Sequence, residues 1–193
     1  QDLIKNAIYS VLLSLIGIII YVSIRFKFSY AIGGIVALLH DVLMMFAVFA
    51  ITRLEVNTMF IAAVLAIIGY SINDTIVCFD RIRENLKQYD KKLTKEKLKE
   101  IVNKSLQETF TRTIVTALTT IFCIIGLMLF GPKDIFAFDT AMLVGSIAGT
   151  YSSIFIAINI FLFFESKNLN KTPKAKKVYK DDVEEKLVKG VNC

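Results

Sequence analysis

Five long apolar stretches constrain the fold of this 193-residue chain more than any other feature of its sequence. A stretch of about 18 apolar residues can cross a bilayer as a helix, because a helix rises about 1.5 Å per residue and the hydrocarbon core is about 30 Å thick. The sequence therefore predicts an all-α membrane protein, a polytopic helical bundle of about five transmembrane helices. The expected spans cover about residues 7–24, 28–51, 59–79, 113–130 and 136–164.

Lysine and arginine residues are concentrated in three of the segments that lie between and after these spans. Of the 23 such residues, 20 fall within 25–27, 80–112 and 165–193. Because loops rich in lysine and arginine stay in the cytoplasm, this asymmetry predicts that the N-terminus lies outside and the C-terminus inside. An outside N-terminus without a visible signal peptide suggests that at least one further span, with or without an outer domain, precedes Gln1.

Two charged segments are expected outside the membrane. In the cytoplasmic loop 80–112, the apolar residues of "LTKEKLKEIVNKSL" recur at helical spacing, which predicts an amphipathic helix on the inner membrane surface. A solvated linker with weak helicity is the alternative. Residues 166–193 are expected to form a basic, mobile cytoplasmic tail on a transmembrane bundle of residues 1–165. Anionic membrane lipids explain the net charge of +6, so no nucleic-acid partner is expected.

An acidic residue interrupts the third span, within "GYSINDTIVCFDRIREN". Asp74 stands six residues before Asp80, about 9 Å inside the cytoplasmic edge of its helix. A charged side chain at such depth costs about 2.5–3.5 kcal/mol. Small and polar residues recur around Asp74 at helical spacing, so this face is predicted to turn toward other helices and away from lipid. The supporting polar residues are expected to be Ser71, Asn73, Thr75 and, from the fourth span, Thr116.

The fourth span supplies a candidate partner for Asp74. Arg112 stands at the cytoplasmic end of a polar stripe that climbs into the bilayer, and its long side chain can reach toward the carboxylate. An aspartate that alternately pairs with an arginine and loses it can bind and release a proton as helices shift. We therefore predict that Asp74 and Arg112 couple proton movement. In the structural alternative, the aspartate bonds backbone amides or hydroxyls, and Arg112 reaches phosphate headgroups.

The second span carries a further ionisable pair, His40 and Asp41, near its middle. Asp41 is expected to lie about 10 Å above Asp74 along the membrane normal. Adjacent helical residues point about 100° apart, so only one of the pair can face a given neighbour squarely. Asp41 shares a face with small residues and is the better candidate for the interior. His40 is either a packed neutral side chain or a member of the same proton relay.

Small residues repeat every four positions in the last span. Gly145, Gly149 and Ser153 form a small-xxx-small face, which allows two helices to approach closely. We interpret these three residues as helix-packing positions.

Several kinds of site are not expected. The three cysteines lack metal-ligand spacing, so the sequence indicates neither a metal site nor a disulfide. No cofactor is expected. No nucleophile–base pair or phosphate loop is present, so an enzyme is not expected. Asp74 with the nearby hydroxyls does offer oxygen ligands suited to a hard cation, so coupling to sodium in place of protons stays open.

Four ordered segments closely resemble the SecF branch of the SecD/SecF family of bacterial protein-export membrane proteins, within the resistance-nodulation-division superfamily. They are "LLHDVL", "GYSINDTIVCFDRIREN", "SLQETFTRTIVTALTT" and "GTYSSIFIA", and the resemblance covers about residues 1–165. It implies a multi-pass protein of the bacterial cytoplasmic membrane that pairs with SecD and assists the SecYEG channel. It also implies use of the proton-motive force to draw preproteins across, with Asp74 and Arg112 in the positions of the family's transmembrane aspartate and arginine.

Two departures from the family pattern are visible. Members of this branch normally begin with another span and a periplasmic domain, and the resemblance implies that Gln1 corresponds to a position after both. Position 78 is cysteine where an aliphatic residue is expected. Other functional readings are a scaffold that holds SecD and the channel together without carrying protons, and half of an exporter of lipids or drugs. The exporter would require a large two-fold repeat, which 193 residues do not show.

Overall fold

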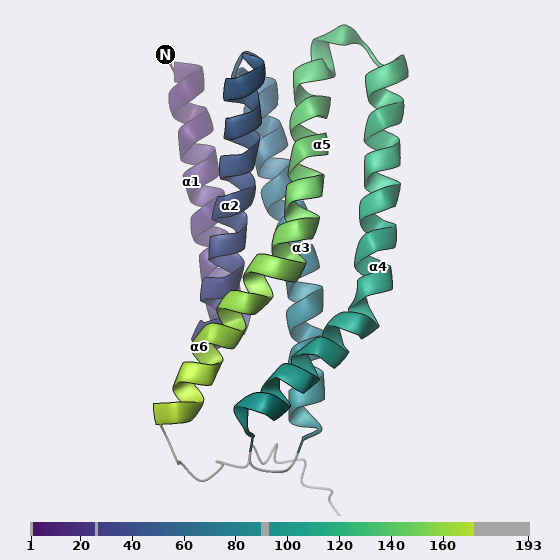
Figure 1. The fold of residues 1–193 in the computed structure, drawn as a ribbon. Helices are drawn as coiled ribbons and strands as arrows, with labels where there is room; N and C mark the ends of the chain where they lie inside the picture. The colour runs from purple at the N-terminus through teal and green to yellow at the C-terminus, as the bar shows by residue number, and fades with distance from the viewer. Residues whose placement is uncertain (1, 26, 90–92, 172–193) are drawn as a thin grey trace, which may run out of the picture.

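The computed structural model describes residues 2–25, 27–89 and 93–171, which form helices and short connections without any strand (Figure 1). The predicted all-α membrane fold is confirmed: α2, α3, α4 and the continuous segment Lys133–Leu169 are each long and apolar enough to cross a membrane. In α1, the apolar part is Tyr9–Val22. The elements are α1 (Asp2–Arg25), α2 (Phe28–Thr52), α3 (Thr58–Lys87), α4 (Lys95–Phe130), the 3₁₀ turn η1 (Lys133–Ile135), α5 (Phe136–Tyr151), the π-helical turn η2 (Ser152–Ala157) and α6 (Ile158–Lys171).

Helices α3 and α4 are longer than a membrane is thick. They contain 30 and 36 residues, hence about 45 and 54 Å of helix against about 30 Å of hydrocarbon. The surplus of both lies at the end that carries the charged 80–112 segment. There α4 bends toward the lower end of α3 (Figure 1).

The helix expected in the 80–112 loop is present, but it is the first part of α4 and not a separate element. Its apolar residues Leu98 and Val102 are completely buried and share one hydrophobic cluster with Ile82 of α3. This face therefore packs against the protein, where the sequence suggested a membrane surface. The reason is that α3 also continues past the membrane and offers an apolar stripe of its own.

The last span is one helical rod interrupted by η2, where its direction changes (Figure 1). It continues through α6 to Lys171, so the first residues of the predicted tail are helical. The rest of that tail, residues 172–193, lies outside the described part of the chain.

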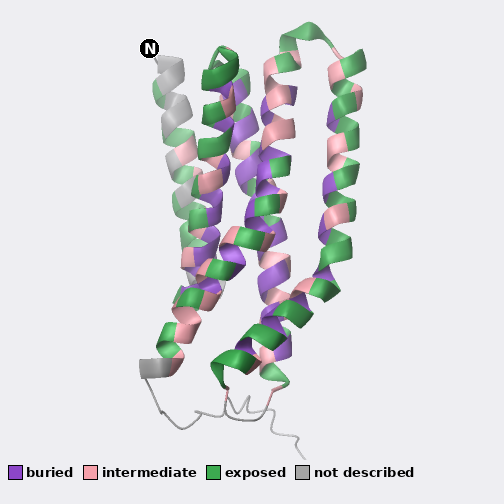
Figure 2. Ribbon diagram, viewed as in Figure 1, coloured by how far each residue is buried: buried purple, intermediate pink, exposed green. Residues whose placement is uncertain are grey.

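Buried side chains gather where α2, α3 and α5 face one another, whereas the membrane half of α4 is largely exposed (Figure 2). Near the junction of α2, α3 and α6, three aromatic rings pack together. The Tyr30 ring stacks on Phe161 with a centroid distance of 4.2 Å and meets the edge of Phe79 at 5.1 Å. This three-ring contact ties the first and last parts of the bundle to α3.

Asn57 caps the N-terminal end of α3. Its side-chain oxygen accepts a hydrogen bond from the Phe60 N–H at 3.1 Å. Asn57→Ala is therefore expected to lower the free energy of unfolding by about 1 kcal/mol, because the first turn loses its acceptor. Thermal unfolding of the detergent-solubilised protein measures the effect. Asn57→Asp keeps an acceptor oxygen and is the control, and equal stability of the two variants would contradict the capping role.

Candidate functional site

Asp74 lies inside the bundle on α3. Asp74 is only 5% exposed, and its Oδ2 atom has no hydrogen-bond partner among the described residues. A buried carboxylate that is charged and unpaired is strongly unfavourable, so this position requires a proton or an approaching positive charge.

Arg112 approaches Asp74 from α4 without pairing with it. Its charge acts on Asp74 across space, but the guanidinium is not within hydrogen-bonding distance of the unpartnered Oδ2. Arg112 is exposed on the surface of the described chain. Asp74 and Arg112, which were predicted to exchange a proton, therefore lie near each other without a hydrogen bond from the guanidinium to Oδ2.

Asp41 is fully buried on α2, and its carboxylate is well satisfied. The Ser71 hydroxyl of α3 donates to Oδ2 at 2.6 Å, and the His40 Nδ1 atom lies 3.1 Å from Oδ1. The Ser152 hydroxyl of η2 is a third partner. Asp41 thus stands where α2, α3 and η2 meet. The His40 side chain is 30% exposed and sits at the edge of the site.

The polar stripe of α3 joins the two aspartates. Ser71 bonds Asp41 and stands one turn before Asp74 on the same helix. The Thr75 hydroxyl donates to the Ser71 carbonyl at 3.1 Å and lies 2.9 Å from the Ser153 hydroxyl. Buried hydroxyls therefore contact Asp41 through Ser71 and continue along the α3 face of Asp74 through Thr75 and Ser153.

Two predicted supporting residues do not join this set. Asn73 is exposed on the other face of α3. Thr116 is exposed as well, and its hydroxyl donates to the Arg112 carbonyl at 2.8 Å. Threonine can satisfy its hydroxyl on its own helix in this way, so a polar stripe on α4 need not face the bundle.

The glycines of α5 bring that helix into the site. A Cβ atom on Gly145 would stand 2.5 Å from Ile67 Cγ1, so α5 and α3 touch through the bare backbone. A Cβ atom on Gly149 would stand 3.3 Å from Ser71 Oγ and 3.5 Å from Asp41 Oδ2. Gly149 therefore lies directly against the hydrogen bond between α2 and α3.

The π-helical turn was not anticipated, and it brings Ser152 into the site. One extra residue per turn allows the consecutive side chains of Ser152 and Ser153 both to be buried, next to Asp41 and Thr75 respectively. Such π turns occur often at functional sites. Ser153, expected only as a packing residue, has a polar contact here. The "YSS" sequence is the signal that could have pointed to both serines.

Other polar groups stand apart from this site. Asp139 is only 1% exposed, and neither of its carboxylate oxygens has a partner among the residues that the structure describes. It lines a cavity of about 430 Å³ near Lys133. It stands ten residues before Gly149 on α5, about 15 Å from the Asp41 level. No group of three or more His, Cys, Asp or Glu side chains that could hold a metal ion occurs in the part of the chain described.

Comparison with known proteins places these features in a family. The family model described as protein export membrane protein SecD/SecF, C-terminal, matches residues 1–167. The protein translocase subunit SecDF of Bacillus subtilis is 51% identical over 171 residues, which cover 89% of this chain and 23% of the relative. The protein translocase subunit SecF of Alicyclobacillus acidocaldarius is 47% identical over 173 residues, 90% of this chain and 56% of the relative.

Solved structures agree in fold. A crystal structure of SecDF in a super-membrane-facing form matches with a TM-score of 0.78 and 36% identity, over 89% of this chain and 23% of that one. A second crystal structure is that of SecDF from Thermus thermophilus, described as a translocon-associated membrane protein. It matches with a TM-score of 0.76 and 40% identity, over 85% of this chain and 22% of that one. The chain thus spans between about a fifth and somewhat over half of the length of these proteins. It belongs to the SecD/SecF family of protein export membrane proteins, in the C-terminal region that the family model describes.

Proposed function

We propose that this chain is the membrane part of an accessory subunit of the bacterial Sec translocase, which acts with SecD to promote protein export at the expense of the proton-motive force. The SecF and SecDF relatives are translocase subunits, and one fuses SecD and SecF in a single chain, which supports SecD as the partner. The observation that carries the proton coupling is the buried Asp74 carboxyl, unpartnered at Oδ2 and under the influence of Arg112.

The coupling works as a two-state device. In one state Asp74 holds a proton and Arg112 is apart from it, as the unpaired arrangement in the structure suggests. When α4 and α3 shift so that the guanidinium reaches the carboxylate, the proton leaves. Moving one elementary charge through 100 mV supplies about 2.3 kcal/mol, which biases the two states roughly fiftyfold. That bias is enough to drive a helix movement in one direction.

Asp41 is the second carboxyl group that we propose to bind the transported proton. Its carboxylate is linked to the Asp74 region through Ser71, and His40 contacts it at the more exposed edge of α2. Ser71 and Thr75 stand between Asp41 and Asp74 on the polar face of α3, so a small rearrangement of that face would be needed to carry a proton from one carboxyl to the other.

The proposed orientation follows from the charge distribution. The lysine- and arginine-rich segments 80–112 and 165–193 face the cytoplasm, and the start of α1 faces outward. The SecYEG channel and translocating preproteins are the remaining proposed partners, with anionic lipids around the basic loops.

Sodium coupling is the second candidate. The oxygens of Asp41, Ser71 and Ser152 converge from three elements, and such oxygen groups suit a hard cation. In this variant the ion would bind at Asp41, while Asp74 and Arg112 would respond to it.

Export measured in vesicles under separately imposed pH and sodium gradients tests the proposal. Membrane vesicles that contain SecYEG, SecD and the full-length subunit are loaded with a preprotein, and its release is measured. A pH gradient is expected to stimulate release severalfold and a sodium gradient to have little effect. Stimulation by sodium alone would favour the second candidate. Stimulation that needs the subunit but no gradient would overturn both and leave a scaffold role, which a pull-down of SecD would then identify.

A further inference from the structure

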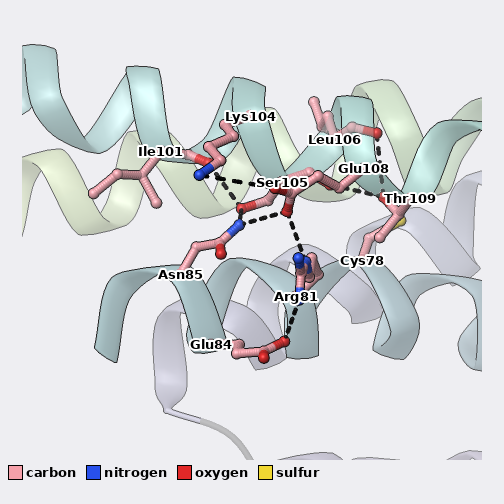
Figure 3. A network of polar contacts seen from close by, with 10 residues as sticks. All are labelled: Cys78, Arg81, Glu84, Asn85, Ile101, Lys104, Ser105, Leu106, Glu108 and Thr109. Atoms are coloured by element: carbon pink, nitrogen blue, oxygen red, sulfur yellow. Dashed lines mark hydrogen bonds and ion pairs between the residues drawn. The ribbon is translucent and has the colours of Figure 1, made fainter. Parts of the chain in front are cut away.

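A polar cluster joins α3 and α4 below the membrane, and it consists of Arg81, Asn85, Ser105 and Glu108 (Figure 3). We call this cluster the cytoplasmic clamp. The Asn85 amide donates to Ser105 Oγ and to Glu108 Oε2, each at 2.9 Å. Arg81 Nε donates to the same Glu108 oxygen at 2.6 Å. One glutamate of α4 thus accepts from two different turns of α3.

The clamp stays intact across the pH range of a working membrane. The hydrogen bond from Asn85 and the adjacent Arg81 hold the pKa of Glu108 below its ordinary value of 4.5. The carboxylate is therefore ionised above that pH, and the flanking charges are Glu84 beside Arg81 and Lys104 at 3.9 Å from Glu108. Any pH response of the membrane site must then originate outside the clamp.

The register of the two helices leads from the clamp to the membrane site. One step above the pair of Arg81 and Glu108, the Cys78 sulfur lies 3.8 Å from the Thr109 hydroxyl. About one further turn along each helix leads to Asp74 on α3 and to Arg112 on α4, because residues three or four apart lie on neighbouring turns of one helix face, about 5–6 Å apart along the axis. The clamp and the proposed proton pair therefore lie along the same interface between α3 and α4, with the contact of Cys78 with Thr109 between them.

Apolar packing alone does not determine this register. Ile82, Leu98 and Val102 are buried in the same cluster, but hydrophobic contact has no direction and tolerates sliding by a turn. By contrast, three hydrogen bonds require one register: those from the buried Asn85 to Ser105 and to Glu108, and that from Arg81 to Glu108. Above the clamp, the membrane half of α4 is largely exposed (Figure 2), and its polar contacts with α3 are hydroxyl contacts, such as Thr113 near Cys78 and Thr120 near Tyr70.

We propose that the cytoplasmic clamp sets the position of Arg112 relative to Asp74 by holding α3 and α4 in this register. The inference rests on the proposed function of that pair and deepens it. Glu108 and Asn85 are positioning residues that act through the placement of α4 and have no contact with the proton. Loss of the clamp allows α4 to shift along α3, which changes the distance between Arg112 and Asp74. Proton release from Asp74 is then no longer coupled to the helix movement.

Cross-linking of Cys78 reports the register directly. In the full-length subunit in membranes, Thr109→Cys is combined with Cys123→Ser and Cys193→Ser, so that mild oxidation joins positions 78 and 109. Glu108→Ala is expected to lower the yield of this cross-link about fivefold, because a second register becomes populated. An unchanged yield at equal protein amount would overturn the proposal.

Export completes the test with matched variants. Glu108→Ala is expected to reduce proton-dependent export about tenfold and to move the pH of half-maximal export by about half a unit, since the charge near Asp74 is displaced. Glu108→Gln keeps an acceptor oxygen of the same reach and should restore most of both. Glu100→Ala is the control, because it removes a 2.6 Å ion pair with Lys97 on the same helix that does not touch α3.

The outcomes separate the two proposals. If Glu108→Ala frees the register while export and its pH dependence match those of Glu100→Ala, the clamp proposal is wrong and the proton pair is unaffected. If Asp74→Asn has no effect on export, the proposed function fails, whatever the cross-link shows. If Glu108→Ala does not accumulate, Asn85→Ala takes its place, because it removes the bonds to Ser105 and Glu108; an unchanged cross-link yield and an unchanged pH profile in that variant would overturn the clamp.

Discussion

Replacing Asp74 with asparagine is expected to abolish the proton-dependent part of export, a loss of at least about tenfold, while the subunit remains assembled with SecD. Asparagine has nearly the same shape but cannot bind or release a proton, so the two-state exchange with Arg112 stops. The fold should tolerate the change, because Asp74 Oδ2 has no hydrogen bond to lose in the described structure and a buried ionisable group is removed. Preprotein release under an imposed pH gradient measures the effect.

The neighbouring residue offers a matched control for Asp74. Asn73 lies on a different, exposed face of α3, so Asn73→Ala should export normally under the same gradient. A pull-down of SecD with the Asp74→Asn variant separates coupling from assembly. Loss of SecD from the complex would indicate a scaffold role, and undiminished gradient-driven export would rule out Asp74 as the coupling group.

The carboxylates of the site could be located from sequence because their helix faces are simple. Asp74 shares its α3 face with small and polar side chains, and this face is buried. Asp41 shares its α2 face with Ala37, which is also buried, whereas the adjacent His40 points to the edge. A period of 3.6 residues was sufficient in both cases, because one face of each helix differs clearly from the others.

The same reasoning fails where a helix is irregular or where two of its faces are alike. The π turn shifts the phase of the last helix, so a constant period could not show that Ser152 and Ser153 are buried together. On α4, threonines occupy both faces: Thr109 and Thr113 are buried, whereas Thr116 and Thr119 are exposed. Charged residues in 95–112 obscured the continuity of α4, because its apolar stripe packs on a neighbouring helix extension that only the fold reveals.

Adding a methyl group at Gly33 is expected to lower the free energy of unfolding by about 2–3 kcal/mol. A Cβ atom there would stand 2.5 Å from the Ala157 carbonyl oxygen and 3.3 Å from Phe79 Cζ. The first neighbour is backbone of the π turn and cannot rotate away, so α2 must separate from the last helix. Overpacking costs about 1–3 kcal/mol in general and more where the neighbour is rigid; a cost of about 3–4 kcal/mol here, less the gain of about 1 kcal/mol in helix propensity, leaves the expected net loss.

Gly34→Ala is the matched control for Gly33→Ala. A Cβ atom at Gly34 would stand 3.6 Å from Ile72 Cδ1 and 3.8 Å from Thr75 Cγ2, which is ordinary van der Waals contact. It should leave the unfolding temperature unchanged or raise it slightly, whereas Gly33→Ala should lower it by about 5–10 °C in detergent. Gly33→Ala should also weaken gradient-driven export, because α2 carries Asp41 and the π turn carries its partner Ser152. Equal unfolding temperatures for the two variants would show that α2 and the π turn do not approach as closely as the structure has them.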